Sequence, residues 1–384
     1  MNKKGANLQK AREFSATISQ LTFRWRQVRS WPGIYRQIQR ESDQVAKRRL
    51  ELSLYTSISI VVFDMIFGLL AAILLIYRPH AIFEPIQKAY LYLNNQVLQS
   101  VVSWLMGSPA GLQMNRNLVM FLGTISLTVV SYWDAVILFL ITSEYIDVAM
   151  RVAVILAILS FAGVSVLLSA VIDLSSFAFF HIFFVYAGVT RLWHLTVRVI
   201  FTFTLLFRGK KYNILKLRVD GHEFDIEQLI LGTVFLSLVV FMLPTVFVFY
   251  LSFLLLWLAV LLLQLILRAG VSIFSFFPVY LYLMSASIPS RIAIEPIVSG
   301  DSKSVSFRLK TLRLRPGVVI SEFLRTVLSS IPVNEPIDNT LMSMVRGTAL
   351  VFPKYAQHEQ AGGKDSIDVG PNYGTLIRRI SNNN

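Results

Sequence analysis

The chain has 384 residues, of which 55% are hydrophobic and 15% are charged, and its mean hydropathy is +0.60. This apolar share exceeds that of a soluble domain, so part of the chain must be buried in lipid. Lys and Arg outnumber Asp and Glu by 36 to 22, which gives a net charge of +14. The sequence contains no cysteine, which excludes disulfides, zinc sites built on cysteine and palmitoylation.

Residues 1–52 form a basic region. Apolar residues recur at steps of three and four from Leu8 to Val28, which predicts a helix with one apolar stripe. The arginines lie mostly off this stripe, as in an amphipathic helix on an anionic membrane surface. Two alternatives are a helix packed on a partner protein and an Arg-rich mitochondrial presequence. We expect Trp31-Pro32-Gly33 to end the helix.

Six apolar segments follow, and each predicts a transmembrane helix because about 20 apolar residues cross a bilayer. They cover residues 53–77, 118–142, 152–172, 174–207, 229–267 and 271–288, and the last two have the least certain ends. Residues 78–117 between the first two are interpreted as a lumenal loop with an interfacial helix. Segment 174–207 is interpreted as a span with an interfacial continuation. Segment 229–267 is too long for one straight span, so we expect it to bend or fold back at Pro244.

Six spans would leave both termini on one side of the membrane. Both terminal regions contain more Lys and Arg than Asp and Glu, which assigns that side to the cytosol. The expected fold is therefore an all-α membrane protein, a polytopic bundle of about six transmembrane helices with a small mixed cytosolic C-terminal region.

Four regions are expected: a basic cytosolic region at 1–52, a transmembrane domain at 53–289, a cytosolic region at 290–356 and a disordered tail at 357–384. Alternating residues over 305–314 predict a strand, which Pro316-Gly317 should end, and residues 318–331 predict a short helix. The tail is rich in Gly, Asn, Ser and charge, which is typical of disorder.

Arg191, His194 and Arg198 share one helical face inside an apolar segment. A charge exposed to lipid costs about 2.5–3.5 kcal/mol on insertion scales, so these side chains should face protein, water or headgroups. We favour a polar contact between helices or subunits, with Asp64 and Asp134 as candidate partners, over contact with headgroups. We interpret His181 as a hydrogen-bonded core residue rather than a haem ligand.

Arg208, Lys210 and Lys211, with Lys216 and Arg218 nearby, form a basic cluster at the end of an apolar segment. Such a cluster is typical of a flank that fixes topology, and contact with lipid phosphate or with an acidic partner is the alternative. The acids at 222–228 precede an apolar run, and Asp225 with Gln228 predicts a capping box rather than a metal or sugar-nucleotide site.

No catalytic motif is present: the sequence has no Ser-His-Asp spacing, H-E-x-x-H, P-loop or G-x-G-x-x-G. We therefore assign no catalytic, cofactor-binding or metal-binding residues and expect no cofactor and no nucleic-acid partner. If the protein takes part in nucleotide-sugar chemistry, the donor site should lie on another chain.

Residues 206–245, which read LFRGKKYNILKLRVDGHEFDIEQLILGTVFLSLVVFMLPT, resemble the PIG-Q family. Residues 104–112, followed by Asn115, are similar to that family's W-L-M-G-x-P-A-G-L element, and residues 173–194 also have its pattern. Many members have a longer region before the first span, and the residues after Gly300 align only loosely.

The resemblance implies a Q subunit of the phosphatidylinositol N-acetylglucosaminyltransferase complex of the endoplasmic reticulum. This complex transfers N-acetylglucosamine from UDP-GlcNAc to phosphatidylinositol, the first step of glycosylphosphatidylinositol anchor synthesis. The resemblance implies an accessory role beside a catalytic PIG-A-type subunit, with PIG-C, PIG-H, PIG-P and PIG-Y types as further partners. A transporter or channel using the intramembrane charges is the alternative, and a self-sufficient lipid glycosyltransferase is a third reading.

Overall fold

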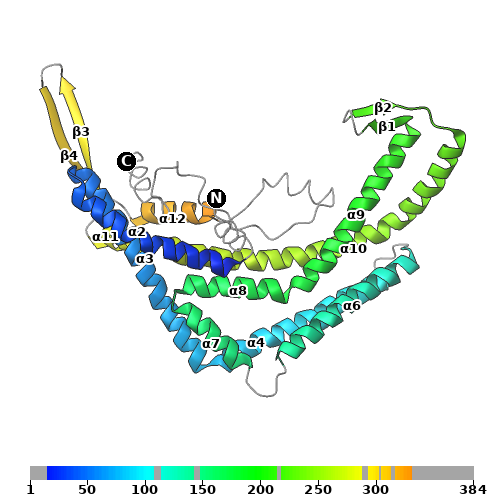
Figure 1. The fold of residues 1–384 in the computed structure, drawn as a ribbon, viewed down its shortest axis with the longest axis horizontal. Helices are drawn as coiled ribbons and strands as arrows, with labels where there is room; N and C mark the ends of the chain where they lie inside the picture. Colours follow the sequence, from blue (N-terminus) through cyan, green and yellow to red (C-terminus); the bar gives the residue numbers. More distant parts are fainter. Residues whose placement is uncertain are drawn as a thin grey trace, which may run out of the picture.

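The structure is a computed structural model that describes residues 15–107, 114–141, 148–213, 218–287, 293–301, 304–312 and 316–330. Helices dominate this part of the chain (Figure 1). The α-helices are α2 (Ala16–Arg40), α3 (Gln44–Tyr77), α4 (Pro79–Leu91), α5 (Gln99–Met106), α6 (Arg116–Ile141), α7 (Val148–Ser160), α8 (Val164–Ala178), α9 (Phe180–Phe207), α10 (Ile226–Phe276), α11 (Val279–Ser287) and α12 (Pro316–Ser330). The predicted fold class, all-α, is confirmed for the described residues.

Two short antiparallel hairpins are the described β-structure. The first pairs β1 (Lys210–Asn213) with β2 (Arg218–Gly221), and the second pairs β3 (Ala293–Asp301) with β4 (Ser304–Leu312). They lie at opposite ends of the molecule, both toward the upper edge of the view in Figure 1; β3–β4 points upward, whereas β1–β2 lies across the end of α9.

Four helices in the described chain are long and apolar enough to cross a membrane, and six spans are not confirmed. The four candidates lie in α3, α6, α9 and α10. The predicted span 152–172 is divided between α7 and α8, which have 13 and 15 residues and are each shorter than a bilayer requires. The predicted span 271–288 is also interrupted, because α10 ends at Phe276 and α11 has nine residues.

Helix α10 does not fold back at Pro244. It runs unbroken for 51 residues with Pro244 inside it, and Figure 1 shows that it bends along its length. At about 75 Å it is more than twice as long as the hydrocarbon core is thick. Of the two expected alternatives, a bend or a fold-back, the structure shows the bend.

The predicted loop at 78–117 is mostly helical. Helix α4 begins at Pro79, a π-helix at Tyr92–Leu98 follows, and α5 continues to Met106. The expected interfacial helix at 90–106 is therefore the second part of a longer helical run, which lies beside α6 in Figure 1. Proline is tolerated at the first position of α4 because that residue needs no intrahelical donor.

The largest core lies between α9 and α10 and includes residues of α5 and α6. Trp257 of α10 is fully buried and contacts Tyr186 and Phe183 of α9 at ring-centroid distances of 6.1 and 5.0 Å. Trp193 lies parallel to Tyr250 at 5.6 Å. These aromatic pairs hold α9 along the middle of α10.

Helix α2 continues past the predicted stop at Trp31-Pro32-Gly33 and ends at Arg40. Pro32 removes one backbone donor, but Ile38 is buried beyond it, so tertiary packing holds the last two turns in place. The predicted residues 8–14 lie outside the described part of the chain.

The C-terminal region partly matches its prediction. The strand expected at 305–314 is β4, its partner β3 was not predicted, and Pro316 begins α12 rather than only ending the strand. Phe323 of α12 packs edge-to-face on Phe277 at 5.1 Å, so this helix rests against the end of α10. Residues 331–384, including the predicted disordered tail, lie outside the described part.

Candidate functional site

Helix α2 packs with its polar face inward. Arg24 and Gln27 are buried, with exposed fractions of 6% and 4%, whereas Trp25 is 67% exposed. The other residues of the predicted apolar stripe within this helix, Ile18, Leu21 and Val28, are also exposed. The face that contacts the bundle is therefore opposite to the one expected for a soluble helix, and the apolar stripe is free to face lipid.

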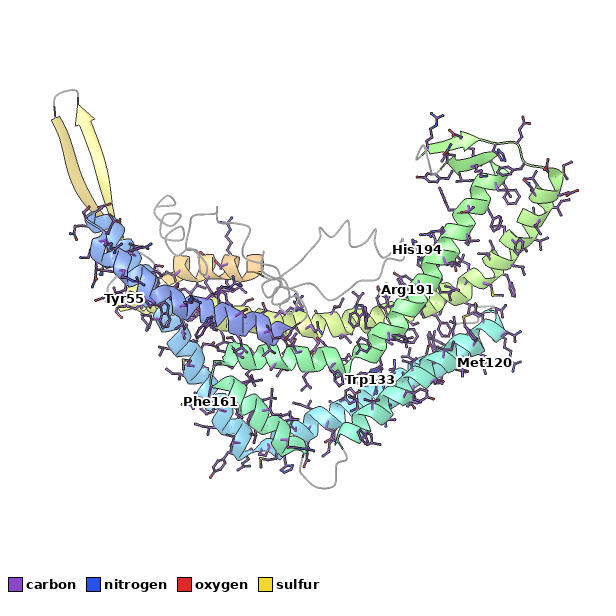
Figure 2. The ribbon with its side chains drawn as sticks, viewed as in Figure 1. Tyr55, Met120, Trp133, Phe161, Arg191 and His194 are labelled. Atoms are coloured by element: carbon purple, nitrogen blue, oxygen red, sulfur yellow. The ribbon has the colours of Figure 1, made fainter. Side chains whose placement is uncertain are left out.

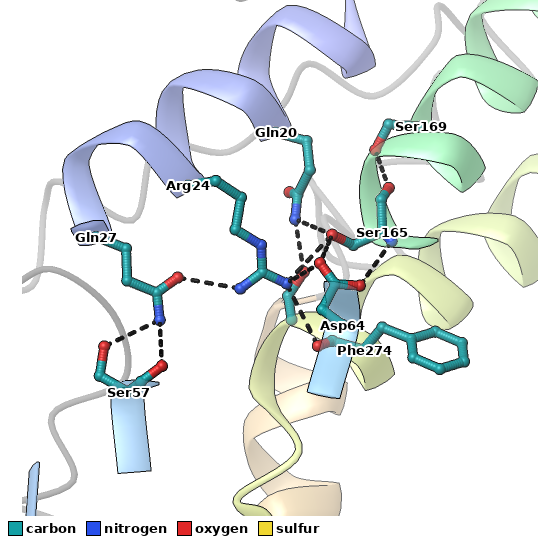
Figure 3. Close-up of polar contacts among 9 residues, drawn as sticks. Gln20, Arg24, Gln27, Ser57, Asp64, Ser165, Ser169 and Phe274 are labelled. Carbon is teal, nitrogen blue, oxygen red and sulfur yellow. Dashed lines mark hydrogen bonds and ion pairs between the residues drawn. The ribbon is translucent and has the colours of Figure 1, made fainter. Parts of the chain in front are cut away.

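The polar face of α2 meets α3, α8 and α10 in a buried junction (Figure 3). Its centre is an ion pair between Arg24 Nη2 and Asp64 Oδ2 at 2.7 Å, with side-chain exposures of 7% and 1%. Arg24 also donates to Gln27 Oε1 at 3.0 Å and to Ser165 Oγ at 3.2 Å. Gln20 donates to Ser165 Oγ at 3.1 Å and to Ser275 Oγ at 2.7 Å, which joins α2 to α8 and α10.

Asp64 also caps α8 from a neighbouring helix. The Ser165 backbone N–H donates to Asp64 Oδ1 at 2.8 Å, and the Ser165 hydroxyl donates to Oδ2 at 2.6 Å. Gly163 precedes α8 and has no side chain of its own to cap it. A carboxylate at a helix N-terminus satisfies free N–H groups and complements the helix dipole. One buried acid thus serves both an arginine and a helix end.

Glycines make this approach possible. Gly163 has φ +125°, and a Cβ there would overlap the carboxylate of Asp64. Gly68 lies one turn after Asp64 on α3, and a Cβ there would overlap the carbonyl oxygen of Ser160 and lie 2.9 Å from backbone atoms of Gly163 and Val164. The break between α7 and α8 therefore rests directly on α3.

Asp173 of α8 caps α2 in the same way. Its carboxylate accepts hydrogen bonds from the backbone N–H groups of Ala16 and Thr17 at 2.8 and 3.0 Å. It also accepts from the hydroxyls of Ser15 and Thr17 at 2.6 and 2.7 Å. The beginning of α2 is thus fixed by a residue more than 150 positions later in the chain.

Substituting Asp173 by Ala should loosen the first turns of α2. Loss of an N-cap costs about 0.5–2 kcal/mol, and here four donors lose their acceptor. Hydrogen exchange of the amides at 16–20, measured in detergent, should become faster. Asp173→Asn retains one carbonyl oxygen and should have a smaller effect. Unchanged exchange in Asp173→Ala would show that the cap does not hold this end.

A second buried polar group links the π-helix, α6 and α9. Asn94 donates to Asp134 Oδ1, and His181 Nε2 donates to Asn94 Oδ1 at 2.8 Å. His181 is 1% exposed, and its ring stacks on Trp133 at 6.1 Å. The interpretation of His181 as a hydrogen-bonded core residue is confirmed, and the described residues contain no group of His, Cys, Asp and Glu side chains that could hold a metal ion.

Arg191, His194 and Arg198 lie on α9. Figure 2 labels Arg191 and His194. Arg191 and Arg198 are exposed, and Arg198 Nη2 donates to His194 Nε2 at 2.7 Å. The proposed pairing of this stripe with Asp64 or Asp134 is wrong, because Arg24 engages Asp64 and Asn94 engages Asp134. The two acids that the transporter alternative would use are thus bound to other residues of the bundle, and these contacts give that alternative no support.

The basic cluster at the end of α9 is exposed. Arg208 follows the helix, Gly209 turns the chain at φ +61°, and Lys210 and Lys211 begin β1. Opposite them, Arg218 is paired with Asp220 at 2.7 Å. The start predicted for α10 at Asp225 is confirmed, but the Asp225 side chain makes no capping hydrogen bond. Lys216 lies outside the described residues.

Sequence reasoning missed the Arg24–Asp64 junction. The signal was present: Gln20, Arg24 and Gln27 are spaced as one face of a helix, and a lone acid in an apolar span needs a cation. Ser165 and Ser169 are 0% and 2% exposed and line this region.

Comparison with known proteins places these features in a family. Residues 18–293 match the family model described as N-acetylglucosaminyl transferase component (Gpi1). The chain is 30% identical over 279 residues to the N-acetylglucosaminyl-phosphatidylinositol biosynthetic protein gpi1 of Schizosaccharomyces pombe, covering 71% of this chain and 42% of that protein. It is 35% identical over 199 residues to human phosphatidylinositol N-acetylglucosaminyltransferase subunit Q, covering 52% and 26%.

The Saccharomyces cerevisiae subunit GPI1 is 25% identical over 303 residues, covering 78% of this chain and 49% of that protein. The chain thus spans less than half the length of each of these relatives, and no solved structure matches it. The matched range contains the Arg24–Asp64 junction, the α9 stripe and the basic hairpin. The chain belongs to the Gpi1 family, which confirms the resemblance to the Q subunits.

Proposed function

We propose that this chain is an accessory subunit of a phosphatidylinositol N-acetylglucosaminyltransferase in the endoplasmic reticulum membrane. Such an enzyme transfers N-acetylglucosamine from UDP-GlcNAc to phosphatidylinositol in the first step of glycosylphosphatidylinositol anchor synthesis. The observation that carries the proposal is the family match, which runs from α2 to the start of β3. The names of the fungal and human relatives support the same reaction.

The sugar-nucleotide site is proposed to lie on a PIG-A-type partner, with the other subunit types completing the complex. Dinucleotide- and nucleotide-binding folds commonly use an open parallel sheet flanked by helices. The described β-structure here consists of two antiparallel two-stranded hairpins. The role left for this chain is to organise other subunits in the membrane beside the lipid acceptor.

The β1–β2 hairpin is proposed to face the cytosol together with both terminal regions. Its lysines follow the apolar α9, and basic flanks stay on the cytosolic side. Beside the four candidate spans, this arrangement requires two further crossings. One lies between α6 and α9, which α7 and α8 would provide together, and the other lies between α10 and the C-terminal region. Both hairpins lie toward the upper edge of the view in Figure 1, which supports placing them on one side of the membrane.

Reversing the charges of Arg208, Lys210 and Lys211 to Glu tests this docking role. Co-purification of the catalytic chain, and transfer from labelled UDP-GlcNAc, should fall about tenfold or more because three exposed attractive charges become repulsive. The matched control reverses three exposed arginines of α2, Arg29, Arg36 and Arg40. The wild-type chain purified alone should show no transfer.

Wild-type yield and activity of the triple variant would remove the docking role but not the family function. Turnover of UDP-GlcNAc by the isolated chain would overturn the accessory role itself. Because the chain has no cysteine, a single Lys211→Cys variant reports the side of the hairpin through labelling with an impermeant maleimide.

A further inference from the structure

The outward face of α9 carries two arginines in the middle of a candidate span. Trp193 and Tyr186 hold the other face against α10. At 100° per residue, Arg191 and Arg198 lie about 140–160° around the helix from Trp193. Both are exposed, and within the described part of the chain neither guanidinium forms an ion pair.

The acids of the described helical core are already engaged. Asp64 contacts Arg24 and the start of α8, Asp134 accepts from Asn94, and Asp173 accepts from the start of α2. None of them is within hydrogen-bonding distance of Arg191 or Arg198. The charge of the α9 stripe is therefore not compensated by these three acids.

Depth makes lipid a poor environment for this stripe. Arg191 is the twelfth residue of the 28-residue helix α9, so roughly 16 Å of helix precedes it and roughly 24 Å follows it. An arginine near a helix end can extend its charged group to the headgroups. Arg198 is closer to the end of α9 than Arg191 and can do this more easily. An arginine that stays at the bilayer centre needs a protein partner or water.

The spacing of the residues on this face suits packing against a second helix. Phe184, Ala187, Arg191, His194 and Arg198 follow steps of three and four, the spacing of a helix–helix contact line. Beside them, Gly188 is exposed, and a Cβ added there would meet no atom within 4 Å. Small residues of this kind allow the backbone of a second membrane helix to approach closely.

We infer that a transmembrane helix of another subunit covers this face and places a carboxylate against Arg191 and Arg198. A carboxylate can accept two parallel hydrogen bonds from a guanidinium, which compensates charge and fixes geometry. His194 accepts from Arg198 and so orients it toward the line. The inference rests on the proposed function, since the partner is a subunit of the same transferase.

The test co-expresses the tagged chain with the other transferase subunits and purifies it in mild detergent. In the variant Arg191→Leu/Arg198→Leu, at least one membrane-spanning subunit should fall about tenfold or more relative to the tagged chain, because its carboxylate loses both partners. Arg191→Lys/Arg198→Lys keeps the charge and should retain most of it. The matched control is Arg29→Leu/Arg40→Leu on the exposed side of α2.

Native ratios of all subunits in the leucine variant would overturn the inference. Native ratios together with loss of co-purified phosphatidylinositol would assign the stripe to a phospholipid instead. If the wild-type chain recovers no transferase subunit, the proposed function fails, which is a separate result.

A labelling measurement covers the case in which the leucine variant is not recovered. The cysteine-free chain with the single change Gly188→Cys should react with a membrane-permeant maleimide more slowly in the assembled complex than alone. Equal rates would contradict a covering helix.

Discussion

Substituting Asp64 by Leu should lower the free energy of unfolding by about 3–5 kcal/mol, because Arg24 would remain buried without a compensating charge. The start of α8 would also lose the acceptor for the Ser165 N–H. The expected result is an earlier loss of the monodisperse peak when detergent-solubilised protein is heated and then analysed by size-exclusion chromatography.

The double variant Arg24→Met/Asp64→Leu separates the effect of an unpaired buried charge from the effect of losing the α8 cap. Removing both members of a buried ion pair is often neutral, so the double variant should be more stable than Asp64→Leu alone. It should remain somewhat less stable than the wild type, since the α8 cap is still absent. If Asp64→Leu unfolds at the wild-type temperature, the junction does not hold the bundle together.

Substituting Gly163 by Ala should be comparably harmful, at about 2–6 kcal/mol. The positive φ contributes about 1–3 kcal/mol of backbone strain, and overlap with the Asp64 carboxylate adds about 1–3 kcal/mol. Gly68→Ala should cost about 1–3 kcal/mol or more, because the atoms its Cβ would meet are backbone atoms of α7 and α8 that cannot move aside independently. The same heating measurement reports both.

Gly33→Ala is the matched control for these glycine variants. Gly33 lies inside α2 with no atom within 4 Å of an added Cβ, so alanine should leave stability unchanged or raise it by up to about 1 kcal/mol. Equal midpoints for Gly163→Ala and Gly33→Ala would refute the close approach of α3 to the α7–α8 break.

The apolar segments were predictable because hydrophobic length alone identifies a helix that can lie in lipid. Four of the six predicted segments contain or overlap long apolar helices, namely α3, α6, α9 and α10. What length could not reveal was the break at Gly163. That break depends on contacts from Gly68 and Asp64, about a hundred positions earlier, and no local pattern encodes such contacts.

The burial of the polar face of α2 was missed for a different physical reason. The predicted amphipathic helix turns its apolar stripe toward the membrane, which the exposure of Trp25 allows, and leaves its arginines in water or at headgroups. Within a membrane bundle, however, apolar side chains lose little by facing outward, while polar groups must find partners inside the protein. The buried line of Gln20, Arg24 and Gln27 is the result. The basic cluster at Arg208, by contrast, directly follows an apolar helix as expected, because its position is local to one helix end.

The capping of α2 by Asp173 has a consequence for how the protein is made. Helix α2 leaves the ribosome before α8, yet its acceptor on α8 is synthesised more than a hundred residues after Arg40. At translation rates of about 5–20 residues per second, that delay is on the order of ten seconds. During this interval the donors at the start of α2 have no acceptor on α8, and membrane chaperones have time to act on the helix.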